Sequence, residues 1–139
     1  KTIYDISNGK AKVKTKVPAV LSSFAILGDN IYTNYWDDNV GDFGKYIYTI
    51  NGKKVDISTA LINPLWLNEE NLLAIEEVNM MRNLCVYNIK TKELSQLNFN
   101  NSSDYFEVDY IYFDGKKIFI EGSNNAGNIE FHTLEVYHQ

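Results

Sequence analysis

Short turn motifs recur along this chain, and each stands between stretches in which apolar and polar residues alternate. Alternation with a period of two predicts β-strands, and a polar pair between two such strands predicts a β-hairpin. Pairs that end in glycine suit the type I′ turn, since both of its central residues need a positive φ. The motifs of this series are Asn8-Gly9, Asn51-Gly52, Asp114-Gly115 and the looser Lys90-Thr91-Lys92.

A second series of turns interleaves with the first, and both series share one period. The turns of the second series end at Asn30, Asn71 and Lys117, which are 41 and 46 residues apart. Four residues occupy equivalent positions in the first series, at spacings of 44, 39 and 47 residues. They are Tyr4, Tyr48, Tyr87 and Leu134. A period of about 40–45 residues is typical of the four-stranded sheets that form propeller blades.

The period predicts an all-β fold of consecutive four-stranded antiparallel meander sheets. Residues 1–17 supply the outer two strands of one blade, 18–59 and 60–100 each supply a whole blade, and 101–139 supply three strands of another. This single all-β unit of about three and a half blades is incomplete, because a closed propeller usually has about four to eight. We expect a piece of a longer propeller or completion by association, and a smaller sandwich or barrel is the alternative.

The stretch NPLWLNEENLLAIEEV, residues 63–78, is compatible with two local structures. A helix over residues 69–83 would have Asn68 as its N-cap and two glutamates in its first turn. However, the apolar residues of this stretch form no single stripe at helical spacing. We therefore predict a turn at residues 68–71 between two strands, with Pro64 at a strand start and Trp66 packed between sheets.

The same stretch resembles the repeat of TolB-like propellers, which also occurs in prolyl-oligopeptidase-type propellers. Pro64, Trp66, Glu69 and the strand Leu73-Ala74-Ile75 match that repeat in place or in kind, whereas Asn68-Glu69-Glu70 replaces its usual Pro-Asp-Gly turn. Two further repeats match only in their turns, Gly28-Asp29-Asn30 and Asp114-Gly115-Lys116. The resemblance implies protein partners at the cell envelope and an extracytoplasmic location, with a cytoplasmic one as the alternative.

The charge and composition of the chain argue against several classes of binding partner. The net charge is −5, so we expect no nucleic-acid binding, which needs clustered cations. Lys10, Lys12, Lys14 and Lys16 alternate, so we predict one solvated strand face or a guarded sheet edge, with phosphate binding as the alternative. The single cysteine, Cys85, excludes an internal disulfide and is expected to be buried. No stretch is long enough for a transmembrane helix, so membrane insertion is not expected.

Few residues suggest chemistry. Asp37, Asp38, Asn39 and Asp42 offer oxygen ligands for calcium, but their spacing departs from the EF-hand, so we favour a solvated loop and expect no cofactor. The pairs Glu69-Glu70 and Glu76-Glu77 are expected at turns and surfaces, because adjacent strand residues face opposite ways.

His132 and His138 share a strand face with Glu130, yet a zinc site needs more ligands. The sequence contains no nucleophile elbow, P-loop or Rossmann glycine motif, so an enzyme is not favoured.

Aromatic residues give the clearest candidate for binding. The candidate binding surface comprises Tyr35, Trp36, Asp37, Asp38, Asp42 and Phe43, and a second aromatic group comprises Tyr105, Phe106, Tyr110 and Tyr112. Such residues anchor interfaces, although in a propeller they also pack between blades. We predict a non-catalytic module that binds a protein or peptide partner. The alternatives are a propeller that accompanies a hydrolase domain and a self-associating module that forms a homo-oligomer.

Overall fold

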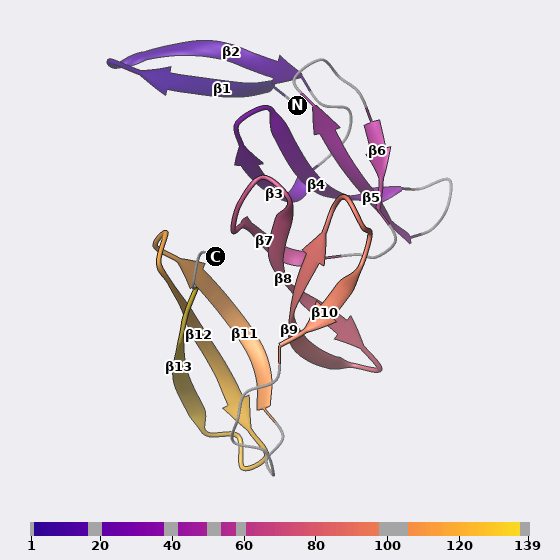
Figure 1. Ribbon diagram of the computed structural model, residues 1–139, viewed down its shortest axis with the longest axis vertical. Helices are drawn as coiled ribbons and strands as arrows, with labels where there is room; N and C mark the ends of the chain where they lie inside the picture. The colour runs from indigo at the N-terminus through magenta and orange to yellow at the C-terminus, as the bar shows by residue number, and fades with distance from the viewer. Residues whose placement is uncertain are drawn as a thin grey trace. The chain divides into compact units, whose positions relative to one another are not determined.

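The computed structural model describes residues 2–16, 21–37, 42–49, 54–57, 61–97 and 106–136. Every regular element in these ranges is a β-strand, and every strand pairing is antiparallel (Figure 1). The prediction of an all-β fold built from antiparallel sheets is therefore confirmed. The chain divides into two compact units, Lys1–Ala60 and Leu61–Gln139. No helix long and apolar enough to cross a membrane occurs in the part of the chain that the structure describes.

The first unit contains a hairpin and a four-stranded sheet. The hairpin joins β1 (Thr2–Ser7) to β2 (Lys10–Lys16), and Asn8 and Gly9 between them have φ angles of 52° and 69°. Both values are positive, as the predicted type I′ turn requires. The sheet follows chain order and consists of β3 (Leu21–Leu27), β4 (Asn30–Asp37), β5 (Asp42–Thr49) and β6 (Lys54–Asp56). The predicted turn at Asn51-Gly52 lies outside the described residues.

The four lysines of β2 do not share one face, although the sequence predicted that they would. The register between β1 and β2 shifts at Lys14, which has no partner on β1. An extra residue of this kind is a β-bulge, and it reverses the alternation of the strand beyond it. Lys10 and Lys12 therefore lie on one face of the hairpin and Lys16 on the other.

The second unit contains two sheets, and both follow chain order without crossovers. The four-stranded sheet consists of β7 (Ile62–Trp66), β8 (Asn71–Val78), β9 (Met81–Asn88) and β10 (Leu94–Gln96). The three-stranded sheet consists of β11 (Phe106–Phe113), β12 (Lys117–Asn124) and β13 (Ile129–Glu135). Strands β8 and β9 occupy the stretch that a helix over residues 69–83 would need. The strand alternative is therefore confirmed and the helix alternative is wrong.

Pro64 is the third residue of β7 rather than at the strand start that the sequence predicted, and it lies within a bulge. The register between β7 and β8 shifts between Ile62 and Leu65, and Asn63 in this gap has a φ of 49°. Proline has no N–H to donate, so it is tolerated where the ladder is interrupted. Trp66 follows at the end of the strand and is buried, as the sequence predicted.

The side chain of an Asn or Asp closes four of the turns of the second unit. In each of them, Oδ1 accepts hydrogen bonds of 2.7–3.0 Å from two backbone N–H groups that follow it. These bonds satisfy backbone donors at the turns locally, which is why Asn and Asp are favoured there. The four residues are Asn68, Asn88, Asp114 and Asn124.

Two turns differ from their predicted form. The backbone N–H of Asp114 donates to the carbonyl of Lys117 at 3.2 Å, which makes Gly115 and Lys116 the central residues. Of these only Gly115 has a positive φ, 99°, so the turn is not type I′. The sequence analysis missed the turn between β8 and β9, where Asn79 and Met80 have φ angles of 52° and 63°.

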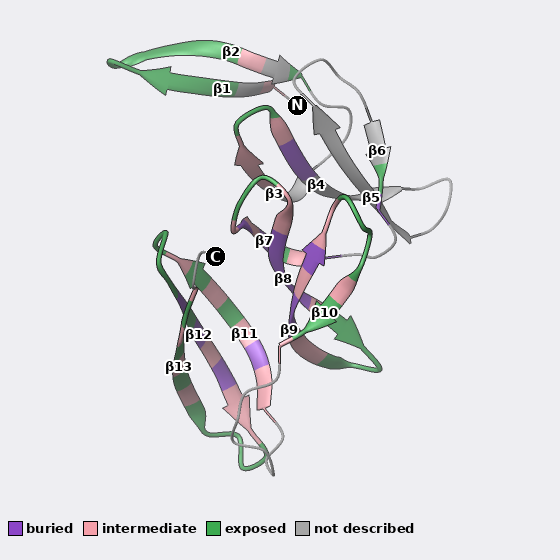
Figure 2. Cartoon of the chain, in the orientation of Figure 1, coloured by how far each residue is buried: buried purple, intermediate pink, exposed green. Residues whose placement is uncertain are grey.

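The hydrophobic core of the second unit lies between its two sheets. The buried side chains of this core come from β8, β9, β11 and β12, and half-buried residues of the same two sheets pack around them (Figure 2). They are Leu73, Ile75, Leu84, Val108, Ile118 and Ile120. The opposite face of the four-stranded sheet is buried as well, since Leu72, Ala74, Cys85 and Tyr87 have no exposed surface. Continuous apolar runs such as Leu72–Ile75 are typical of strands that are covered on both faces.

Candidate interaction surface

The binding surface predicted from the sequence lies on the β4–β5 hairpin. The register pairs Trp36 with Phe43 and Asp37 with Asp42, so these backbones are brought together at one end of the hairpin. Tyr35 pairs with Gly44 on the same two strands. Asp38 lies outside the described residues, as do the side chains of the other five members. The grouping of the backbones follows from the register, and binding by these residues stays a prediction.

Glu130 and His132, two of the residues considered for a zinc site, contact one another on β13. His132 Nε2 lies 3.1 Å from Glu130 Oε2, which places both on one face as their spacing predicted. Asn124 Nδ2 donates to Glu130 Oε1 at 2.8 Å, and this bond, with the contact to His132, lowers the pKa of Glu130. No cluster of three or more potential metal ligands occurs within the described ranges, and His138 lies outside them.

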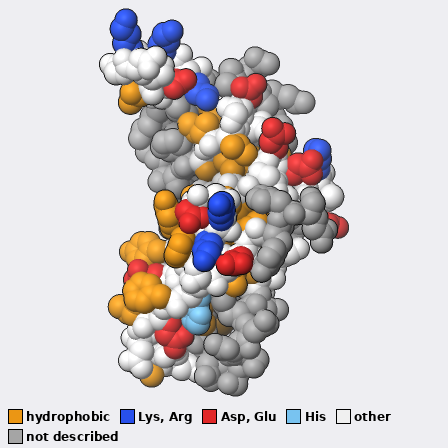
Figure 3. Space-filling view, turned by 60° about the vertical axis from the view of Figure 1, so that its left-hand side comes forward, with side chains coloured by type: hydrophobic (Ala, Val, Ile, Leu, Met, Phe, Trp, Pro, Cys, Tyr) orange, Lys and Arg blue, Asp and Glu red, His pale blue; other side chains and the backbone are white. Residues whose placement is uncertain are grey.

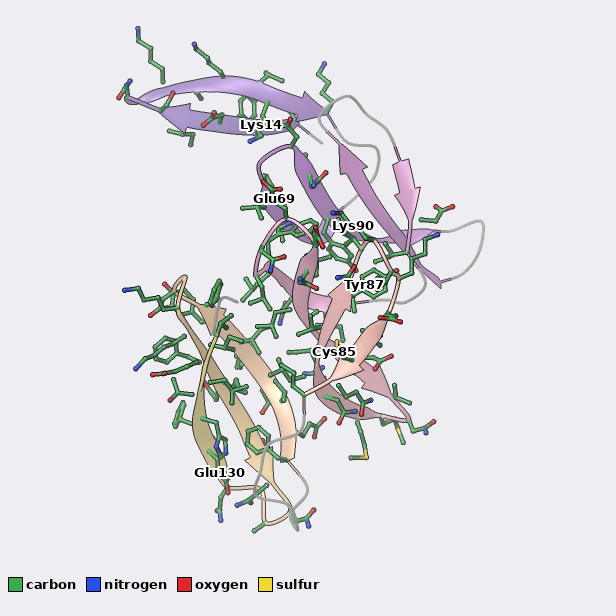
Figure 4. All side chains as sticks on the ribbon, viewed as in Figure 1. Lys14, Glu69, Cys85, Tyr87, Lys90 and Glu130 are labelled. Atoms are coloured by element: carbon green, nitrogen blue, oxygen red, sulfur yellow. The ribbon has the colours of Figure 1, made fainter. Side chains whose placement is uncertain are left out.

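One glutamate of each predicted pair has a basic partner on a neighbouring strand or turn. Glu70 forms an ion pair with Lys90, which joins the first turn of the four-stranded sheet to its last. Figure 4 labels Lys90 and Glu69, the neighbour of Glu70 in that first turn. Asn88 Nδ2 donates to Asn71 Oδ1 at 3.1 Å between the same two turns. Glu77 lies 3.3 Å from Arg82 across the turn between β8 and β9. These contacts hold the hairpins together and support the predicted structural roles at turns and surfaces.

Cys85 is buried in β9, as predicted, and its thiol donates to the carbonyl of Ala74 at 3.4 Å. Burial, with a smaller contribution from the charge of Glu76, raises the pKa of this thiol to about 12. Since the thiolate is the reactive form, Cys85 has the properties of a packing residue rather than of a nucleophile.

Large apolar side chains are exposed on the outer face of the three-stranded sheet, opposite the core. Tyr110, Tyr112, Phe119, Ile129 and Phe131 have exposed fractions of 64%, 63%, 42%, 64% and 76%. We call these five residues the aromatic face. They share one side because Tyr112 pairs with Phe119, while Tyr110 and Phe131 both pair with Glu121. The rings of Tyr112 and Phe119 are 6.1 Å apart, and hydrophobic side chains gather over this sheet in the lower part of Figure 3.

A bulge at Asp109 directs the tyrosines of β11 outward. Val108 pairs with Gly122 and Tyr110 with Glu121, so Asp109 is the extra residue. Without it, Val108 and Tyr110 would alternate onto the same side of the strand. With it, Val108 is buried in the core and Tyr110 is exposed.

Two polar contacts fix the Asp109 side chain at this bulge. Ser123 Oγ on β12 donates to its Oδ2 at 3.0 Å, and Arg82 on β9 lies 3.9 Å from its Oδ1. Asp109 is thereby tied to both sheets of the unit, so the bulge is held from two sides.

Of the second aromatic group, only part reaches the surface. Tyr110 and Tyr112 are exposed, whereas Phe106 is half-buried on the inner face, where its ring packs edge-on against His132 at 4.8 Å. Tyr105 lies outside the described residues. The sequence analysis did not single out Phe119 and Phe131, although each alternates with residues that point the other way, Ile118 and His132. That opposite parity was the signal that could have found them.

The aromatic face is large for an uncovered surface. Its four aromatic side chains together expose about 500 Å², taking about 200 Å² as the area of one such side chain. Apolar patches above a few hundred Å² commonly mark interaction sites. No family model matches this chain, and no curated protein matches it. The geometry of this surface is therefore the basis on which a function is inferred.

Proposed function

We propose that this chain is a non-catalytic interaction module of a β-propeller protein, and that the aromatic face is its contact with a protein partner. The observation that carries the proposal is the exposure of five large apolar side chains on one face of a sheet. Aromatic side chains supply large contact areas at small conformational cost, which is why they dominate the energetic centres of protein interfaces.

The propeller part of the proposal is supported by strand order and burial. Both four-stranded sheets are meanders that join neighbour to neighbour, which is the strand order within a blade. The two central strands of the β7–β10 sheet, β8 and β9, bury apolar side chains on both faces, as the central strands of a blade do. The likeness of residues 63–75 to the TolB-like repeat supports a location at the cell envelope and a protein or peptide partner.

The ionisable groups of the second unit support a non-catalytic role. Glu70, Glu77, Glu130 and Glu135 each contact a basic side chain of the same unit, and these contacts connect strands and turns. The thiol of Cys85 is buried with a raised pKa. Side chains engaged in this way stabilise hairpins rather than assemble a nucleophile beside a base.

A selection experiment tests the proposal. The purified chain is used to select binders from a displayed library of random peptides, and their Kd values are measured against a Tyr112→Ser/Phe131→Thr variant. We expect most binders to lose at least about tenfold in affinity, because a buried aromatic anchor contributes upward of about 1.4 kcal/mol. Tyr4→Ser is the matched control, since Tyr4 is another exposed strand tyrosine, 56% exposed, on β1. Binders that are indifferent to the double variant would overturn the assignment of this face.

A further inference from the structure

The three-stranded sheet of the second unit carries large apolar side chains on both faces, but only those of its inner face are covered by the described residues. Its inner side chains pack into the core, whereas the aromatic face has exposed fractions from 42% to 76%. In the four-stranded sheet of the same unit, the central strands β8 and β9 also carry apolar side chains on both faces, and these are buried on both. Strands with apolar side chains on both faces are usually packed against other elements on both faces. The described residues pack against only one face of this three-stranded sheet.

We infer that a second copy of this chain covers the aromatic face with its own aromatic face, in an antiparallel two-fold dimer. The inference rests on the proposed function, because it names the partner of the same surface. In a two-fold contact one patch serves both copies, so a single self-complementary surface is sufficient.

The area of the patch agrees with a dimer of moderate affinity. About 500 Å² of exposed aromatic surface on each copy gives about 1,000 Å² in total, before Ile129 and the polar rim are added. A biological interface usually buries upward of about 1,000 Å². A partner without an equal apolar patch would bury less apolar surface against this face.

The charges on the face select the antiparallel orientation. Glu121 lies between Tyr110 and Phe131 in the register, and no ion-pair partner of Glu121 occurs among the described residues. Lys117 is on the same face of β12, four residues or about 13 Å away. Covering Glu121 with apolar surface alone would be costly, because a buried carboxylate needs a partner.

An antiparallel pairing supplies that partner. The two-fold axis would lie between the two aromatic faces, perpendicular to the strands and at the level of Phe119. It would place Glu121 of each copy against Lys117 of the other. A parallel arrangement would instead bring the two Glu121 carboxylates together. Lys117 already lies 3.5 Å from Glu135 on its own sheet, so both carboxylates would share the lysine at the rim of the contact.

Sedimentation equilibrium tests the dimer across about a hundredfold range of concentration around the micromolar Kd expected of an interface of this size. We expect a reversible dimer whose Kd rises at least tenfold in Tyr112→Ser/Phe131→Thr and is unchanged in Tyr4→Ser. Circular dichroism confirms that each variant is folded. A dimer that survives the double variant would overturn the inference, since its interface would lie elsewhere.

A charge exchange tests the orientation. Glu121→Lys and Lys117→Glu should each weaken the dimer severalfold, because each places like charges opposite one another. An equimolar mixture of the two variants should restore association, since both cross-subunit pairs are then attractive. Failure of the mixture to associate more tightly than either variant alone would overturn the antiparallel arrangement.

The two proposals fail in different ways. A chain that stays monomeric over the whole range, while selected peptides still bind through Tyr112 and Phe131, overturns the dimer and leaves the proposed function in place. A dimer through this face combined with peptides that bind elsewhere overturns the proposed peptide contact and supports the dimer.

Discussion

Replacing Gly122 by alanine is expected to destabilise the second unit strongly, because no space for a methyl group exists on the inner face of β12. A Cβ added there would lie 2.3 Å from the carbonyl oxygen of Glu107 and 2.4 and 2.8 Å from two ring atoms of Phe106. The ring of Phe106 can turn away, but the carbonyl belongs to the ladder in which Glu107 pairs with Ser123. Relief therefore requires the two strands to separate locally.

The magnitude follows from the two clashes. Overpacking of a core usually costs about 1–3 kcal/mol, and a clash with fixed backbone belongs at the upper end of that range. We expect the Gly122→Ala variant to lose about 3 kcal/mol of unfolding free energy. With a urea m-value of about 2 kcal/mol/M, the midpoint would fall by about 1.5 M.

Urea unfolding followed by circular dichroism measures this loss, with Thr133→Ala on the neighbouring strand as a control for an exposed site. Adding Phe106→Leu to Gly122→Ala should recover only part of the stability, because it removes the ring contact and leaves the carbonyl contact. If Gly122→Ala were within about 0.5 kcal/mol of the wild type, Phe106 and Glu107 could not pack on Gly122 as described, and the arrangement of the inner face would be refuted.

Three further perturbations have defined outcomes. Met80→Gly should raise the unfolding free energy by about 1 kcal/mol, because Met80 has a φ of 63° that glycine adopts without strain, and a lower urea midpoint would contradict this. Cys85 should react with a thiol reagent at pH 8 only as fast as the chain unfolds, because burial raises its pKa to about 12, and rapid labelling of the native chain would contradict its burial. Hydrogen bonds in the folded chain lower the pKa of Asp114 from 3.8 and the pKa of Glu130 from 4.5. Both carboxylates therefore contribute their full stability at pH values above 3.8 and 4.5, and this stability is lost as the pH falls through the lower pKa values of the folded state. Asp114→Asn should flatten the acid limb of a plot of stability against pH, and an unchanged limb would contradict the assignment.

Local sequence signals were sufficient to predict several of the hairpins. A polar turn residue and alternation on both sides are short-range features, so Asn8-Gly9 was identified with its turn type and residues 68–71 with their position. The turn at Asn79 and Met80 was missed because methionine rarely adopts a positive φ and gives no turn signal.

The ambiguity over residues 63–78 has a specific physical cause. An N-cap Asn accepts hydrogen bonds from the backbone N–H groups two and three residues later, and in this turn Asn68 accepts from Glu70 and Asn71 in the same way. The local bonds of a helix start and of this turn are therefore alike. The pairing of β8 with β9, such as Ile75 with Leu84, decides for the strands, in agreement with the absence of an apolar stripe at helical spacing.

The bulges set the limit on predicting which face a residue occupies. Alternation assigns faces correctly only as far as the next unpaired residue, and one extra residue inverts every assignment beyond it. Lys14 moves Lys16 off the predicted face, and Asp109 separates Tyr110 from Val108. Neither residue is a glycine or proline, so the sequence carried no local mark of the interruption.

The bulge at Asp109 also explains why the aromatic face can be apolar without weakening the core. An uninterrupted β11 would have to place Val108, Tyr110 and Tyr112 together, either in the core or outside it. The extra residue lets Val108, Ile111 and Phe113 pack inward while both tyrosines point outward, so one strand contributes apolar side chains to two surfaces. Because Ser123 and Arg82 hold the Asp109 side chain from β12 and β9, the outward direction of the tyrosines is fixed by the folded unit itself. Because the strands that carry these tyrosines are already ordered in the folded unit, association requires no further ordering of their backbone, which favours a partner surface that is ordered as well.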